Sequence, residues 1–212
     1  MTPSDHHSDP AGVRIEAFLH AHEADRIPHP GGTLLAHLRR VAALLADWGC
    51  DPAVQAAGLC HAAYGTDGFD RTLLSPDRRE ELADLIGRRA EALVHLYASC
   101  DRAAVYPRLG VERTPVFRDR FTGDERTPTE EELRAFLAIT VANELDVLAH
   151  NAELAARYGP DLYGLFARVR SLLPPAAWQA CTDLLGPKAG GQHGPDAQSH
   201  VKKGTGPGRE RA

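Results

Sequence analysis

Two consecutive helix patterns between residues 29 and 67 constrain the fold more than any other part of the chain, and each places a histidine among apolar residues. In the first pattern, Thr33 follows a Pro-Gly-Gly break and is a favourable N-cap residue. Apolar residues then recur at steps of three and four until Gly49, which favours the end of a helix. The sequence therefore predicts a helix of roughly four turns with His37 inside its apolar pattern.

The second pattern begins directly afterwards. Asp51 and Pro52 again place an N-cap residue before a proline at the first helical position, and residues 53–64 are almost all apolar. A helix with so few polar residues is expected to be buried on most sides. It carries His61, so we expect two imidazoles from neighbouring helices in the interior of the protein.

The rest of the chain predicts a mainly α-helical fold. Apolar periodicity and capping signals indicate further helices at residues 13–22, 75–86, 88–99, 129–159, 162–173 and 176–185. Alternating residues around a Thr-Gly-Asp turn indicate one small β-hairpin near residues 116–126. We expect a single helical-bundle domain at residues 11–186, between disordered tails at residues 1–10 and 187–212 whose composition is too polar to fold.

Composition argues against several classes of partner. The net charge is −5, and the one Lys/Arg cluster lies in the C-terminal tail, so we expect no nucleic-acid binding. No apolar run reaches about 18 residues, so we expect no membrane insertion. The N-terminus has neither a basic start nor an apolar stretch, which favours a cytoplasmic protein. The four cysteines are far apart, which favours reduced thiols.

A third polar residue is expected to join the two histidines. Asn143 falls on the same helical face as several apolar residues, so its amide should point inward. An unsatisfied amide there would cost about 1–3 kcal/mol, so it needs a partner. Imidazoles suit zinc, manganese, nickel or iron, although a single histidine in an apolar stripe more often donates to a backbone carbonyl.

The runs TLLAHLRRVAALL, AAGLCHAAYGT and TVANELDVL resemble the three signature helices of the HD-domain superfamily. In that superfamily a histidine, a His-Asp pair and a distant aspartate bind one or two divalent metals. The resemblance makes His37 the first ligand and His61 the second, whereas Ala62 and Asn143 stand where the two aspartates should be. Members that keep the aspartates are mostly phosphohydrolases acting on nucleotides, and a minority are di-iron oxygenases. The passage looks closest to a bacterial branch of unknown function.

These departures change the chemistry that the resemblance implies. The inherited site loses both negative charges, so we expect no dinuclear centre. Asp67 is the best candidate to replace the lost negative charge at the metal site. An equal alternative is that Asp67 forms a turn beside a glycine. His29 and Asp146 are weaker candidates, and for Asp146 a solvated or salt-bridged position is the stronger expectation.

Other residues are candidates to bind substrate. The guanidinium groups of Arg40, Arg118 and Arg120 suit phosphate or carboxylate, although such a residue is more often a surface ion-pair partner. Tyr64 offers a hydroxyl, with a plain core aromatic as the alternative. Asp101 and Arg102 are interpreted as a local ion pair.

Three functions remain open. In the first, one divalent metal held by His37 and His61, with His29, Asp67 or Asn143, supports hydrolysis of a small phosphorylated molecule. In the second, the metal is iron and the reaction is oxidative. In the third, there is no metal, and the histidines, Asn143 and Tyr64 form a neutral hydrogen-bonding pocket that binds a small molecule or does acid/base work on it. A homodimer is a further alternative, because the apolar face of the last helices suits a core or a dimer surface equally; its residues are Leu162, Phe166, Leu172 and Trp178.

Overall fold

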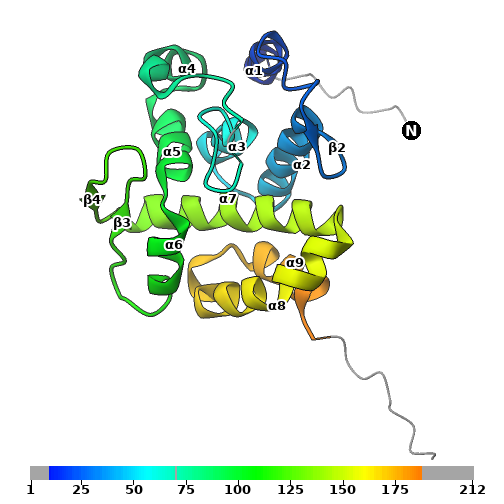
Figure 1. The fold of residues 1–212 in the computed structure, drawn as a ribbon, viewed down its shortest axis with the longest axis vertical. Helices are drawn as coiled ribbons and strands as arrows, with labels where there is room; N and C mark the ends of the chain where they lie inside the picture. The colour runs from blue at the N-terminus through cyan, green and yellow to red at the C-terminus, as the bar shows by residue number, and fades with distance from the viewer. Residues whose placement is uncertain (1–9, 70, 188–212) are drawn as a thin grey trace, which may run out of the picture.

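The computed structural model describes residues 10–69 and 71–187 and confirms a mainly α-helical fold with a small hairpin (Figure 1). The predicted tails lie outside the described residues, except for Pro10 and Pro187 at their inner ends. In chain order the elements are α1 (Pro10–Ala21), β1 (Pro28–His29), β2 (Gly32–Thr33), α2 (Leu34–Asp47), α3 (Pro52–Cys60), η1 (Pro76–Arg78), α4 (Arg79–Ile86), α5 (Arg88–Ser99), α6 (Arg102–Val105), η2 (Tyr106–Arg108), β3 (Phe117–Arg118), β4 (Glu125–Arg126), α7 (Glu130–Ala149), α8 (Ala152–Arg168), η3 (Arg170–Leu172) and α9 (Pro175–Leu185).

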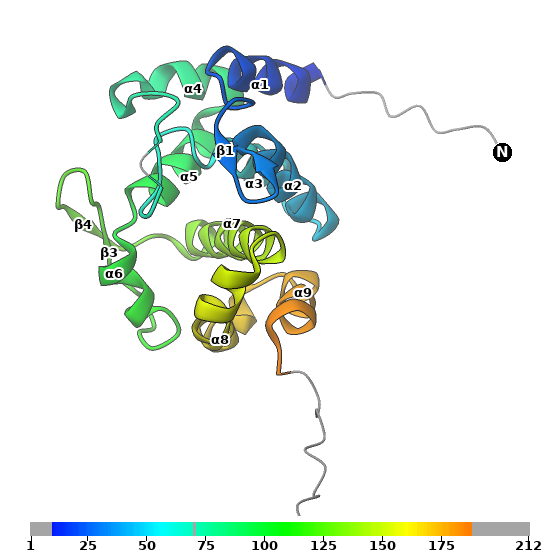
Figure 2. The same cartoon turned by 45° about the vertical axis from the view of Figure 1, so that its right-hand side comes forward.

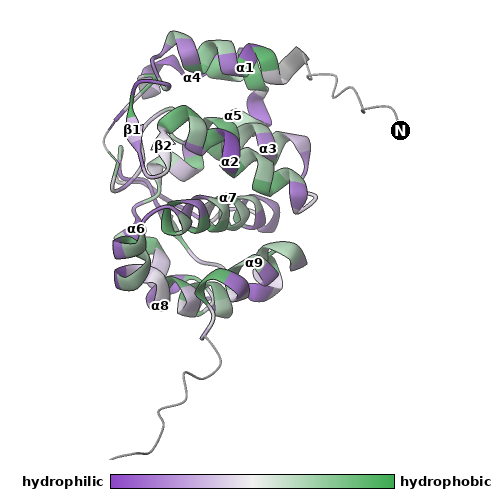
Figure 3. Ribbon diagram, turned by 90° about the vertical axis from the view of Figure 1, so that its right-hand side faces the viewer, coloured by the Kyte–Doolittle hydropathy of each residue, from purple (hydrophilic) through white to green (hydrophobic). Residues whose placement is uncertain are grey.

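The helices stack in layers, with α7 crossing the middle of the molecule. Seen edge-on, α1 and α4 lie above α2, α3 and α5, and α8 and α9 lie on the opposite side of α7 (Figure 3). One cluster of buried apolar side chains contains residues from α1 through α9. Among the described residues, no helix has the length and apolar character needed to cross a bilayer.

The first two layers form as the sequence predicts. The Thr33 side chain accepts a hydrogen bond from the backbone N–H of Ala36 and caps α2, and the Asp51 side chain does the same for α3. Close contact between the two helices depends on Gly58, because a Cβ atom there would lie 2.2 Å from a methyl carbon of Leu45. Gly58 therefore allows α2 and α3 to pack closely enough for their facing sides to contact each other.

α7 supplies the third wall of the site. Thr129 and Glu132 form a reciprocal capping box at its start, as the sequence suggests. Most of the helix is buried, and it packs against α2, α5, α8 and α9. Asn143 and Asp146 are three residues apart on this helix and therefore share a face.

The predicted end of this helix is wrong. α7 ends at Ala149, and the Asn151 side chain accepts the N–H of Leu154 to start α8. Pro160 lies inside α8 and not at a boundary. The local capping bond of Asn151 decides the break, and packing of α8 and α9 against α7 accommodates the proline.

Two short ribbons flank the helices. The hairpin predicted near residues 116–126 is confirmed, with Phe117 paired to Arg126. A second ribbon, β1 with β2, comes directly before α2 in the chain and lies beside it (Figure 2). Of the apolar face considered for a dimer, Phe166 is fully buried, and the other three residues are partly buried against the core. Much of that face therefore belongs to the interior.

Candidate functional site

Three polar side chains from α2, α7 and the end of α3 converge in the interior. Nε2 of His37 lies 3.4 Å from Nε2 of His61 and 3.1 Å from Oδ1 of Asn143. Both imidazoles are almost completely buried. The structure thus brings together the two histidines and the amide that the sequence singles out, although Asn143 lies 106 positions after His37 along the chain.

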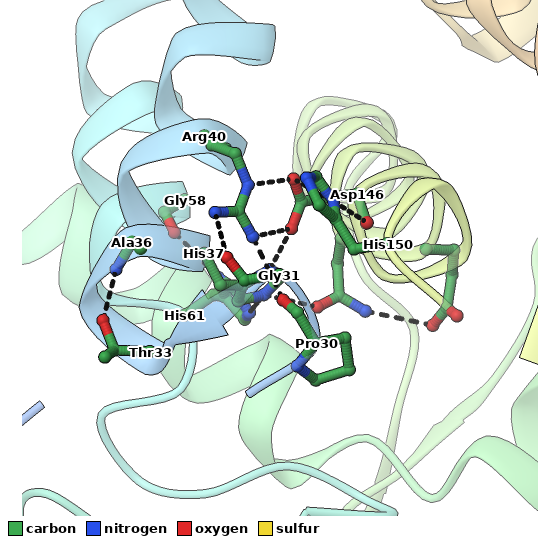
Figure 4. Close-up of polar contacts among 12 residues, drawn as sticks. Pro30, Gly31, Thr33, Ala36, His37, Arg40, Gly58, His61, Asp146 and His150 are labelled. Carbon is green, nitrogen blue, oxygen red and sulfur yellow. Dashed lines mark hydrogen bonds and ion pairs between the residues drawn. The ribbon is translucent and has the colours of Figure 1, made fainter. Parts of the chain in front are cut away.

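Each of these side chains is held from behind by an acceptor. Nδ1 of His37 lies 2.6 Å from a carboxylate oxygen of Asp146, and Nδ1 of His61 lies 2.7 Å from the carbonyl oxygen of Gly58 (Figure 4). These acceptors place a proton on both Nδ1 atoms. The amide nitrogen of Asn143 donates to Glu144 at 3.1 Å, which leaves its oxygen towards His37.

The result is a set of three electron-pair donors around one point: two imidazole Nε2 atoms and one amide oxygen. Burial lowers the pKa of His61 to about 3, and the neighbouring His37 imidazole acts in the same direction. His61 is therefore neutral at pH 7 and keeps its lone pair. Three acceptors at this spacing repel one another unless a cation or a proton lies among them.

A buried ion pair supports His37. Asp146 is 3% exposed, and Arg40 donates to both of its oxygens, at 2.6 and 2.9 Å (Figure 4). Burial by itself raises the pKa of the Asp146 carboxyl, but hydrogen bonds from His37 and Arg40 outweigh that effect and lower it to about 2. His150 donates to the backbone oxygen of Asp146 at 2.8 Å. Asp146 is therefore salt-bridged, and it also orients an imidazole.

Arg40 does not have the position expected of a substrate ligand. Its guanidinium contacts Asp146 and the carbonyl oxygens of Pro30 and Gly31. It lies behind the histidines and not among the residues that line their cavity. Its charge is used to hold the carboxylate in place.

The converging side chains line a cavity of about 260 Å³, which we call the histidine cavity. His29 also lines it, with its ring stacked on that of His37 at a centroid distance of 4.0 Å. Burial lowers the pKa of His29 to about 4, with a further contribution from the neighbouring His37 imidazole. Asp67 lines the same cavity, and its Oδ2 accepts the backbone N–H of Arg102 at 2.9 Å.

Arg102 is a residue of this cavity that the sequence analysis does not identify. Its guanidinium pairs with Glu144 at 3.1 Å and donates to the hydroxyl of Tyr97 at 3.0 Å. The expected ion pair with Asp101 is wrong, because Asp101 caps α6 and its carboxylate lies near Arg118. In the sequence, one feature indicates a structural role for Arg102. It directly follows Asp101 at the start of a short helix.

The structure does not bring the remaining candidates to the histidine cavity. The Tyr64 hydroxyl donates to Glu91 at 3.0 Å, on the side of α5 and α4. Arg118 lies on the exposed hairpin, and Arg120 donates to the carbonyl oxygen of Ala98. None of the three lines the cavity.

The donor set fits a single divalent metal better than a dinuclear centre. In a tetrahedral site with metal–nitrogen bonds of about 2.0–2.1 Å, two ligand nitrogens lie about 3.4 Å apart. The two Nε2 atoms have this separation. Within residues 10–69 and 71–187, no group of three or more His, Cys, Asp or Glu side chains could hold a metal. A metal at this site would therefore depend on the amide oxygen of Asn143 as its third donor.

Comparison with known proteins adds one finding. Residues 18–102 match the family described as Domain of unknown function (DUF6817). The matched segment contains both histidines and ends before Asn143. No curated protein and no solved structure matches the chain.

Proposed function

We propose that the histidine cavity binds one divalent cation together with a small anionic molecule, and that the protein hydrolyses a phosphorylated substrate there. The observation that carries this proposal is the convergence of three donors, each with a hydrogen-bonded partner behind it. Metal-binding histidines characteristically donate their other ring N–H to a carboxylate or a backbone carbonyl, and both arrangements occur here.

The residues around the donors have separate roles in this proposal. His37, His61 and Asn143 hold the ion, and Asp146 adds negative charge behind His37. A bound divalent ion supplies a Lewis acid that lowers the pKa of water towards neutrality. Asp67 uses Oδ2 to accept the Arg102 N–H, so its Oδ1 serves as the proton acceptor for the attacking water.

An anionic substrate would be attracted by the bound divalent ion, because the charged side chains of the wall are one cation, Arg102, and two carboxylates, Asp67 and Glu144. The Arg102 guanidinium pairs with Glu144 at 3.1 Å and remains beside the cavity as a hydrogen-bond donor. The volume of about 260 Å³ suits the phosphate end of a small molecule and not a large one. In this proposal the side chain of Asn143 contacts both the ion and the substrate.

The proposal is tested with protein purified without chelator. We expect metal-dependent release of phosphate from 2-naphthyl phosphate or from a panel of nucleoside monophosphates. His61→Asn should abolish this activity, because the asparagine amide can still donate to Gly58 while the Nε2 ligand is lost. Unchanged hydrolysis by His61→Asn, or none by the wild-type protein with zinc, manganese, nickel or iron, would refute it.

One observation favours a metal-free alternative, in which the cavity binds a small molecule without hydrolysis. A second proton on His37 would also satisfy the site, since its Nε2–H could donate to Asn143 at 3.1 Å while Nδ1–H donates to Asp146. Nitrogen chemical shifts of the imidazoles distinguish a protonated His37 from a metal-bound one. Iron in the purified protein with oxygen consumption would instead support an oxidative reaction.

A further inference from the structure

A larger cavity lies directly beside the histidine cavity, and the activity proposed above does not use it. It has a volume of about 740 Å³ and lies between the α6–η2 segment and α8. We call it the apolar cavity, because its lining is mostly hydrocarbon and aromatic; it includes Tyr106, Tyr158, Leu162, Gly164 and Leu165. Its volume is in the range typical of small-molecule sites, about 300–1,000 Å³.

The two cavities share a wall. Gly68, Arg102 and Glu144 line both of them, and Arg102 and Glu144 form an ion pair at 3.1 Å. A molecule that crosses this wall would have one end beside the two histidines and the other among the aromatic residues. The cation of Arg102 would then lie near its middle.

The apolar cavity also contains a polar group without a partner. The hydroxyl of Tyr106 is buried and makes no hydrogen bond within the described residues. Burial raises the pKa of this phenol, so it remains a donor at pH 7. Buried hydroxyls are rarely left unpaired. The Tyr106 oxygen is closed to solvent in this structure, so an oxygen atom of a bound molecule would provide the missing acceptor once the ring turns towards the cavity.

A second cation borders the same cavity. Arg168 donates to the carbonyl oxygen of Leu109 at 3.3 Å, and no carboxylate among the described residues forms an ion pair with it. Asp161 and Glu144 line the cavity as well, so two carboxylates balance its two cations. The occupant is therefore expected to be apolar in its body and to carry oxygen acceptors that Arg168 can bind.

From these observations we propose that the substrate is amphiphilic: its aromatic or aliphatic part occupies the apolar cavity, and its phosphate extends past Arg102 and Glu144 to the histidines. This proposal rests on the proposed function for the placement of the phosphate. The occupancy of the apolar cavity itself can be tested without any metal or catalysis.

The experiment uses two fluorescent probes, 2-naphthol and 2-naphthyl phosphate, titrated into the full chain. Gly164 lines the apolar cavity, and a Cβ atom there meets nothing within 4 Å, so the side chain of Gly164→Leu starts in open space and takes up part of the cavity. Gly12→Leu is the matched control, because Gly12 also lies in a helix with open space around it, on α1.

We expect both probes to bind the wild-type protein, and Gly164→Leu to weaken binding at least tenfold while Gly12→Leu leaves it unchanged. Tyr106→Phe should weaken the binding of 2-naphthol several-fold, because it removes the hydroxyl that donates to the probe and leaves the ring in place. Absence of binding in the wild-type protein, or equal binding by Gly164→Leu, would overturn the proposal. Binding that depends on Gly164 without any hydrolysis would support this cavity and refute the proposed function instead.

Discussion

Replacement of Asp146 by asparagine tests the electrostatic support of the site. The substitution keeps the size of the side chain and an oxygen that can accept the N–H of His37, but it removes the charge that Arg40 and His37 share. The pKa of this carboxyl falls from 3.8 to about 2 on folding. A shift of this size corresponds to about 2–3 kcal/mol of stability at pH 7, at about 1.4 kcal/mol for each pKa unit.

The pH dependence has a definite sign. A carboxyl whose pKa is lowered by folding stabilises the protein above its unfolded pKa, and that contribution is lost as the pH falls through the folded value. The difference between wild type and Asp146→Asn should therefore be fully present at pH 7 and should shrink between about pH 4 and pH 2. The groups that face the carboxylate are His37, Arg40 and His150.

Chemical unfolding in the presence of chelator measures this difference without interference from metal. We expect Asp146→Asn to be about 2–3 kcal/mol less stable at pH 7, with a Tm lower by roughly 5–10 °C. Asp47→Asn, at an exposed position near the end of α2, is the control and should change stability by less than about 0.5 kcal/mol. A loss below about 0.5 kcal/mol for Asp146→Asn, or a loss that does not vary with pH, would refute the reasoning.

Three further substitutions have expected outcomes. Asn143→Asp adds an anionic ligand and should tighten the binding of zinc or manganese at least tenfold, as measured by calorimetry. Asn151→Asp keeps an N-cap residue on α8 and should leave this affinity unchanged. Equal affinities of the two variants would argue against the donor set. Gly58→Ala should cost about 1–3 kcal/mol in denaturant unfolding, because its methyl group meets Leu45, and a neutral result would show that α2 and α3 can separate freely. Tyr106→Phe should raise the free energy of unfolding of the ligand-free protein by about 1 kcal/mol, because it removes a buried hydroxyl without a partner. A decrease in the free energy of unfolding of similar size would show that the hydroxyl has a hydrogen-bond partner.

The sequence predicts the fold best where local signals decide it. The caps at Thr33, Asp51 and Thr129 start helices as expected, and α5 has the predicted bounds of residues 88 and 99. The sequence does not predict the break at Asn151, because Gly159 and Pro160 form a stronger local signal for the end of a helix. Packing of α8 against α7 overrides that signal, and both residues lie inside α8.

The candidate site was predictable only in part. His37, His61 and Asn143 could be found because buried polar residues interrupt apolar helical patterns, and the HD-like resemblance links them. The roles of Arg40 and Arg102 depend on contacts with Asp146 and Glu144, which lie 106 and 42 positions away and which no local pattern encodes. Tyr64 was misplaced for the same reason, since the sequence does not show which side of its helix faces Glu91.

The central claim is that two imidazoles and one amide form a binding site for a single divalent ion. Elemental analysis of protein purified without chelator, compared with His61→Asn prepared in the same way, tests it most directly. The account predicts about one zinc, manganese, nickel or iron ion per wild-type chain and none in the variant. A folded wild-type protein that contains no metal and takes up none of these ions, or a variant that retains the ion, would contradict it.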